Sequence, residues 1–233
     1  MRKSILAAAA AVATFGMAGS ASAAITMSGA VANQLYTLNS GSMLENFDDV
    51  DSPLTTFSGN LRGPYASVYN VSDSAPPPYT GDGAITACCQ SGQNYAADPT
   101  RYASVQANQT ATFATVGPYY LTSFSFYIGS PDEYNHVTFN FVGGGSETFD
   151  GKEIWGGPVF NGDRTKGYRV YYDFGGAKVS SITFSTESTN AFEFDGLAGS
   201  VAVPEPGTWA LMILGFGGAG AALRSNRRRA AAI

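Results

Sequence analysis

The stretch Leu121-Thr122-Ser123-Phe124-Ser125-Phe126-Tyr127-Ile128 decides the fold class of this chain. Within 121–128, bulky apolar residues recur at every second position, and small polar residues stand between most of them. Side chains of a β-strand alternate between its two faces, so a period of two is typical of a strand that buries one face. We therefore expect a half-buried strand in an antiparallel sheet.

The same alternation continues along the body of the chain. It recurs at 137–141, 168–174, 182–184 and 192–194, and clusters of Gly, Pro, Asn and Asp separate these runs. We expect no helix in the body. About eight such strands are most economically arranged as two packed sheets. The sequence thus predicts an all-β fold, an antiparallel β-sandwich of jelly-roll type.

One less regular segment, 70–98, is rich in proline and glycine and predicts a long irregular surface loop. It contains the adjacent pair Cys88 and Cys89. Neighbouring Cα atoms lie about 3.8 Å apart, below the usual ~4.4 Å minimum for a disulfide, so a bond between these two residues would close a strained ring. In an oxidising compartment, we expect either a disulfide between these two neighbours or disulfides to other molecules, with equal weight. Reduced thiols are the less favoured third alternative.

The first residues, 1–23, have the pattern of a secretory signal peptide. Arg2 and Lys3 form a positive start, 5–17 is apolar, and Ala21-Ser22-Ala23 supplies the small residues of a cleavage site. We therefore expect export through the Sec translocon, with signal peptidase cutting after Ala23.

The last residues, 203–233, form a separate C-terminal signal. Pro204, Glu205 and Pro206 predict an extended, accessible peptide. From Trp209 to Leu223 no residue is charged, and as a helix this run would extend roughly 22 Å, against ~30 Å of membrane hydrocarbon. We expect a single, marginal transmembrane helix at 209–223, with the basic end held in the cytoplasm. That end is Arg224, Arg227, Arg228 and Arg229.

This tail closely resembles the PEP-CTERM sorting signal in its Pro-Glu-Pro-x-x-Trp-Ala variant, which residues 204–210 match as Pro-Glu-Pro-Gly-Thr-Trp-Ala. A Gly-Phe-Gly-Gly core at 215–218 and the arginine-rich end complete the likeness. The resemblance implies an exosortase that recognises the tail and removes it close to Pro-Glu-Pro. It also implies an association with exopolysaccharide and biofilm matrix.

The body, 24–202, resembles a family of exosortase-dependent surface proteins. The likeness extends from Arg101 to Ala198 and is carried mainly by the Gly-Ser-x-Asp-x-Tyr-Asn type of loop at 129–135 and by Phe-Glu-Phe-Asp-Gly-Leu-Ala at 192–198. A Pro-Asp-Glu sequence lengthens or recasts that loop in this chain. The resemblance implies a fold and a location, and it implies no biochemical activity.

Charge limits the partners of the body. The span 24–202 holds 17 of the 18 acidic residues but only 7 of the 13 basic ones, a net charge of −10. Such a surface repels phosphate backbones, so we expect no nucleic-acid partner. The acids either hold calcium, which takes clustered oxygen ligands, or simply end strands and solubilise turns. The calcium candidates are Asp48, Asp49, Asp51, Glu193 and Asp195.

Catalytic signatures are few. His136 is the only histidine, and the chain has no Gly-x-Ser-x-Gly motif, so a nucleophilic hydrolase is not indicated. A glycosidase needs only two carboxylates and stays open as a lesser alternative. Carbohydrate binding is a stronger alternative, because aromatic side chains can stack on sugar rings. Its candidates are Tyr65, Tyr119, Tyr120, Trp155 and Tyr171.

Ice binding would need a long regular threonine array, and Thr110, Thr112 and Thr115 alone are too few.

Taken together, the sequence predicts a non-enzymatic, exported protein with no cofactor, or with calcium alone. It is held briefly at the inner membrane and then carried to the cell surface or the extracellular matrix. Its expected partners are an exosortase and an exopolysaccharide.

Overall fold

The computed structural model describes residues 24–32, 34–35, 41–65, 74, 77, 100–129, 132–159, 161, 167–203 and 206–230, without the side chains of 206, 208, 209 and 225–230. The predicted signal peptide, including Ala21 and Ala23, lies outside these residues, as do Cys88, Cys89, Pro204 and Glu205. Of the predicted loop 70–98, only Ser74 and Pro77 are described, and both are buried.

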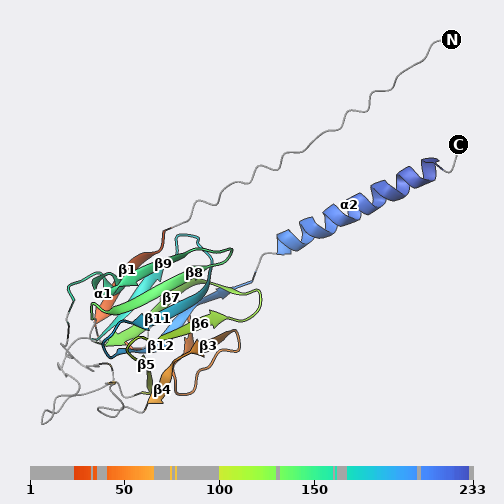
Figure 1. The fold of residues 1–233 in the computed structure, drawn as a ribbon. Helices are drawn as coiled ribbons and strands as arrows, with labels where there is room; N and C mark the ends of the chain where they lie inside the picture. Colours follow the sequence, from red (N-terminus) through yellow and green to blue (C-terminus); the bar gives the residue numbers. More distant parts are fainter. Residues whose placement is uncertain are drawn as a thin grey trace, which may run out of the picture.

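The strands of the described residues form one curled antiparallel sheet whose two parts, here called the first and second layers, face each other (Figure 1). The first layer has the order β3 (Thr55–Gly59), β6 (Thr110–Thr115), β11 (Val179–Thr186), β8 (Asn135–Phe141) and β9 (Ser146–Asp150). The second has the order β1 (Thr26–Ala32), β10 (Gly167–Asp173), β7 (Tyr120–Gly129), β12 (Phe192–Ala202), β5 (Tyr102–Val105) and β4 (Arg62–Tyr65), with β2 (Ser42–Glu45) also pairing with β12. The all-β, antiparallel prediction is confirmed.

Aromatic side chains from both layers fill the space between them. The ring of Phe184 on β11 stacks on that of Phe194 on β12, with centroids 4.2 Å apart, and meets Phe126 on β7 edge-on at 5.3 Å. Offset and edge-to-face pairs of this kind add roughly 0.5–1.5 kcal/mol to the hydrophobic gain from burial. The layers join as one sheet where Leu121 of β7 pairs with Val179 of β11.

Strand β7 differs from the prediction in one respect, because it is buried on both faces. Phe124 and Phe126 face the core as expected, but Ser125 and Tyr127 on the other face are also fully buried. The strand lies in the middle of the second layer, between β10 and β12. The polar face of β7 is covered by other polar groups of the protein. Alternation in the sequence shows that this face is polar, but not whether it meets water or protein.

Two helices accompany the strands in the described part of the chain. Helix α1 (Gly151–Trp155) was not expected, since a single turn is too short to show a helical period. Its start is held by Glu153, which accepts a hydrogen bond from the backbone nitrogen of Asp150. Helix α2 (Pro206–Ala230) includes the predicted helical run 209–223 and stands clear of the sheet (Figure 1).

The prediction that 209–223 spans a membrane is not supported. Among the described residues, no helix combines the length and the apolar character that a crossing requires. The uncharged run ends at Arg224, and the four glycines of 215–220 lower its mean hydropathy.

The aromatic core gives a first prediction. Replacing Phe184 by alanine leaves a cavity between the layers, and we expect the free energy of unfolding to fall by about 3–5 kcal/mol. Urea unfolding monitored by circular dichroism measures it. Val142→Ala is the control, because Val142 is 51% exposed and should change stability by less than about 0.5 kcal/mol. Equal losses in both variants would contradict this account of the core.

Candidate functional site

A fully buried arginine, Arg169 of β10, is the centre of the polar groups behind the second layer. Its guanidinium donates hydrogen bonds to the carbonyl oxygens of Gln34, Leu35 and Gly196, and to the hydroxyl of Ser125 at 2.8 Å. Burial lowers the pKa of Arg169 to about 10, and the nearby Tyr171, Asp195 and Tyr127 oppose that shift. The side chain is therefore still charged at neutral pH.

Arg169 is aligned with acidic and phenolic partners across three strands. In the strand register, Arg169 lies opposite Tyr127 of β7, and Tyr127 lies opposite Asp195 of β12. Directly opposite residues of neighbouring strands share a face, so the three side chains form one row. Asp195 and Glu193 alternate with the core-facing Phe192 and Phe194 of β12 and are nevertheless buried, with exposures of 1% and 8%.

A second buried polar cluster lies on the neighbouring strand β5. The hydroxyls of Ser74 and Ser104 are 2.6 Å apart, and the side-chain amide of Gln106 donates to Ser74, also at 2.6 Å. Ser104 pairs with Glu193 across β5 and β12. Sequence reasoning missed this cluster and Arg169. The only available signal was a charged residue between the apolar Tyr168 and Val170, which solvent exposure explains equally well.

The early acids form a turn after β2. The side-chain oxygen of Asn46 accepts hydrogen bonds from the backbone nitrogens of Asp48, Asp49 and Val50. Its amide nitrogen donates to Asp49, and Asp48 accepts from the backbone nitrogen of Arg101. These carboxylates thus close the turn and attach it to the residues that lead into β5.

Strand β2, which leads into the early acids, pairs with β12, which carries Glu193 and Asp195. Asp48 and Asp195 contact consecutive residues, since Thr100 donates to Asp195 at 2.8 Å and Arg101 donates to Asp48. In the part of the chain that the structure describes, however, no three His, Cys, Asp or Glu residues are grouped so that they could hold a metal ion. Calcium binding stays a prediction of the sequence.

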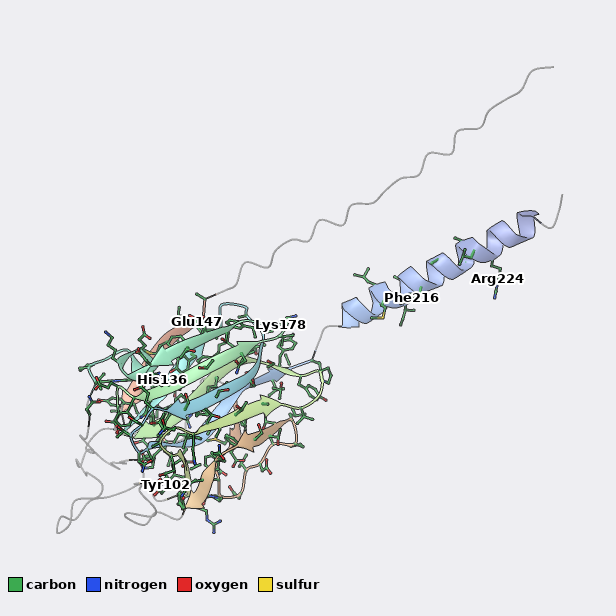
Figure 2. All side chains as sticks on the ribbon, viewed as in Figure 1. Tyr102, His136, Glu147, Lys178, Phe216 and Arg224 are labelled. Atoms are coloured by element: carbon green, nitrogen blue, oxygen red, sulfur yellow. The ribbon has the colours of Figure 1, made fainter. Side chains whose placement is uncertain are left out.

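The other candidates are dispersed. The imidazole of His136, which is labelled in Figure 2, lies 3.3 Å from the carboxylate of Glu187 in a solvent-accessible pair. Four of the five aromatic candidates belong to four different elements, and Tyr119 lies directly before β7. Trp155 stacks on Tyr168 at 4.3 Å, Tyr65 packs against Tyr102, and the hydroxyl of Tyr171 donates to Gln34.

The C-terminal segment is arranged quite differently from the body. Strand β12 ends at Ala202, Val203 is 54% exposed, and α2 begins at Pro206. The apolar side chains of α2 are exposed, Phe216 to 75%, and Figure 2 shows Phe216 and Arg224 projecting from a helix that lies apart from the strands. The family model of the PEP-CTERM protein-sorting motif matches residues 202–229.

The chain carries a PEP-CTERM sorting motif. The motif begins at the last residue of β12 and includes almost all of α2. It marks the chain as an exported protein that an exosortase recognises. No curated protein is significantly similar to the chain. Pro206, Trp209, Arg227, Arg228 and Arg229 of the predicted signal lie on α2, and their side chains are outside the described set.

The arginine site gives a second prediction, through Gly196. A Cβ on Gly196 would stand 2.7 Å from the Nη2 atom of Arg169, and the residue has a φ of +55°. Gly196→Ala should therefore combine left-handed backbone strain of about 1–2 kcal/mol with displacement of a buried charge, for a total loss above about 3 kcal/mol. Urea unfolding measures the loss.

Gly117→Ala is the matched control for this experiment. Gly117 has a similar φ of +64°, but a Cβ there would meet no atom within 4 Å. The control should show the backbone strain alone. If the two variants lose the same stability, the packing of Arg169 against Gly196 does not matter to the fold.

Glu45 at the end of β2 gives a prediction about pH. Burial raises the pKa of this carboxyl, although the backbone nitrogen of Phe47 donates to it at 2.6 Å. Because the pKa of Glu45 is higher in the folded state, the contribution of this group to stability is fully present below the ordinary pKa of 4.5. That contribution is lost as the pH rises through the higher pKa of the folded state. Glu45→Gln keeps the acceptor but cannot ionise, so it should be more stable than the parent at pH 7 and equal to it near pH 3.5.

Urea unfolding of parent and variant across this pH range measures the difference. Glu133→Gln is the control, because Glu133 is an exposed carboxyl. An advantage of Glu45→Gln that grows toward acidic pH would show that burial does not raise the pKa of Glu45.

Proposed function

We propose that this chain is a non-enzymatic surface or matrix protein, associated with exopolysaccharide or biofilm, from which an exosortase removes the C-terminal signal. The observation that carries the proposal is the PEP-CTERM motif at 202–229, placed directly after the last strand. Every strand of the described residues ends at or before Ala202, where the motif begins, so the signal can be removed without taking a strand from either layer.

The junction is also open to an enzyme. Val203 is exposed, and the apolar side chains of the first turns of α2, from Leu211 to Leu214, are between 50% and 73% exposed. A helix that packed on the body would bury such residues, since burial stabilises by roughly 25 cal/mol per Å². Their exposure fits a segment that is bound by the sorting machinery and not by the sheet.

The proposal includes the finer features expected from the sequence. These are a jelly-roll-like sandwich, a cleaved signal peptide with signal peptidase and the Sec translocon as its partners, and a brief stay at the inner membrane before release to the surface. The body, 24–202, is the part that remains. Its charge of −10 favours solubility and disfavours contact with nucleic acid.

Processing of the tail gives a prediction that mass spectrometry can check. Protein harvested outside the producing cells should end near Ala202, and Glu205→Ala should accumulate as a chain that extends to Ile233. Glu133→Ala, an exposed glutamate of the body, is the control and should be processed as the parent is. Recovery of the intact parent chain outside cells that contain an exosortase would refute the proposal.

A further inference from the structure

The outer face of the first layer carries an ordered array of hydroxyl side chains, which we call the hydroxyl face. Its central row runs across the whole layer in register, one residue from each strand: Ser58, Thr112, Thr183, Thr138 and Thr148. A second row is Thr56, Ala114, Ser181, Asn140 and Ser146, and a third is Thr110, Ser185, His136 and Asp150. All of these residues are half-buried or exposed.

Counting threonines along the sequence could not reveal this face. Thr110 and Thr112 belong to it, but Thr115 does not, because it lies on the opposite side of β6. The remaining members come from strands that are distant in the chain and are brought together by pairing. Neighbouring strands lie about 4.8 Å apart and alternate residues roughly 6.7 Å apart, so the array is a regular grid.

Hydrogen bonds within the face hold its side chains in place. The hydroxyls of Thr112 and Thr183 are 3.1 Å apart, and those of Thr138 and Thr148 are 2.8 Å apart. The amide of Asn140 donates to Ser181 at 3.1 Å. A hydroxyl has one donor and two acceptor sites, so each retains capacity for an outside partner. Side chains already fixed lose little entropy when such a partner binds.

The chemistry of the face restricts the partner. The central and second rows contain no ionisable and no aromatic residue, and His136 and Asp150 are confined to one end of the third row. An anionic partner would find no lysine or arginine in these rows on a body of charge −10, and the carboxylates that a cation would meet, Asp150 and Glu187 beside His136, lie together at one end of the face. A partner matched to this face is uncharged, extended and rich in groups that both donate and accept hydrogen bonds.

We propose that the hydroxyl face is a binding surface for a neutral polysaccharide, whose chains lie across strands β3, β6, β11, β8 and β9. The location of the protein among polysaccharides rests on the proposed function, but the surface and its ligand class rest on the grid itself. Binding is by hydrogen bonds to side chains on the sheet and not by aromatic stacking, so it differs from the carbohydrate site expected from Tyr65 or Trp155.

The test uses protein harvested from the producing cells and sedimentation with three neutral probes: cellulose, an insoluble β-1,3-glucan, and the neutral polysaccharide fraction of the same cells. The parent should bind at least one of them, should not bind alginate gel, and should keep its affinity in high salt, because no ion pair is involved. The double variant Thr138→Val/Thr183→Val should bind roughly tenfold more weakly, as two hydroxyls are lost.

Valine matches threonine in shape and favours strands, so the variant should fold, and circular dichroism checks this. If it does not, Thr148→Val at the edge of the layer replaces it. Thr122→Val, on β7 of the other layer, is the control and should bind as the parent does. The proposal is overturned if no neutral probe is bound, if alginate is bound equally, or if the hydroxyl variants bind as the parent does. It is also overturned if the protein binds no glycan but shapes growing ice crystals, since ordered water is then the partner.

Mass spectrometry of the same sample separates this proposal from the previous one. A chain that ends near Ala202 and binds no glycan overturns the hydroxyl face alone. A chain that binds through this face but keeps its tail overturns the processing alone.

Discussion

The second layer depends on one constraint, which is that the charge of Arg169 must be satisfied away from water. An unpaired buried charge costs several kcal/mol, so each nitrogen of the guanidinium needs a partner. The carbonyl oxygens of Gln34, Leu35 and Gly196 supply most of them, and Asp195 provides opposite charge two strands away. Because these partners come from distant parts of the chain, the arginine fixes the N-terminal segment against β12 and leaves no room for a side chain at position 196.

This arrangement separates the body from its sorting signal. The body closes on itself through the aromatic core and the arginine site, and its last strand, β12, lies between β7 and β5 and is not an edge. The PEP-CTERM motif starts where that strand ends. A tail appended to an interior strand can be recognised or lost without opening the sheet, which suits a signal that acts once and is then discarded.

The sequence predicted the parts of this molecule that depend on local pattern. Alternation over 121–128 and 168–174 correctly indicated antiparallel strands, and the Pro-Glu-Pro tail was recognisable because its three features are contiguous. It could not predict that Ser125 and Tyr127 are buried, because alternation reports only that the two faces differ. Nor could it find Arg169 as a structural centre, since its partners at 34–35 and 196 are related to it only by the fold. The five-residue helix α1 was likewise too short to leave a period.

The two polar faces of the sheet show why residue type alone does not assign function. Behind the second layer, the side chains of Arg169, Ser125 and Asp195 are buried and hydrogen-bonded to other side chains or to backbone, so their bonding capacity is used in holding the fold. On the central row of the hydroxyl face they are neutral hydroxyls, partly exposed, and those of Thr112, Thr183, Thr138 and Thr148 bond sideways to side chains of neighbouring strands. Burial consumes the hydrogen-bonding capacity of the first group, whereas the second retains it toward solvent. A face of the second kind, repeated in register over neighbouring strands, is the one from which the body can bind a partner.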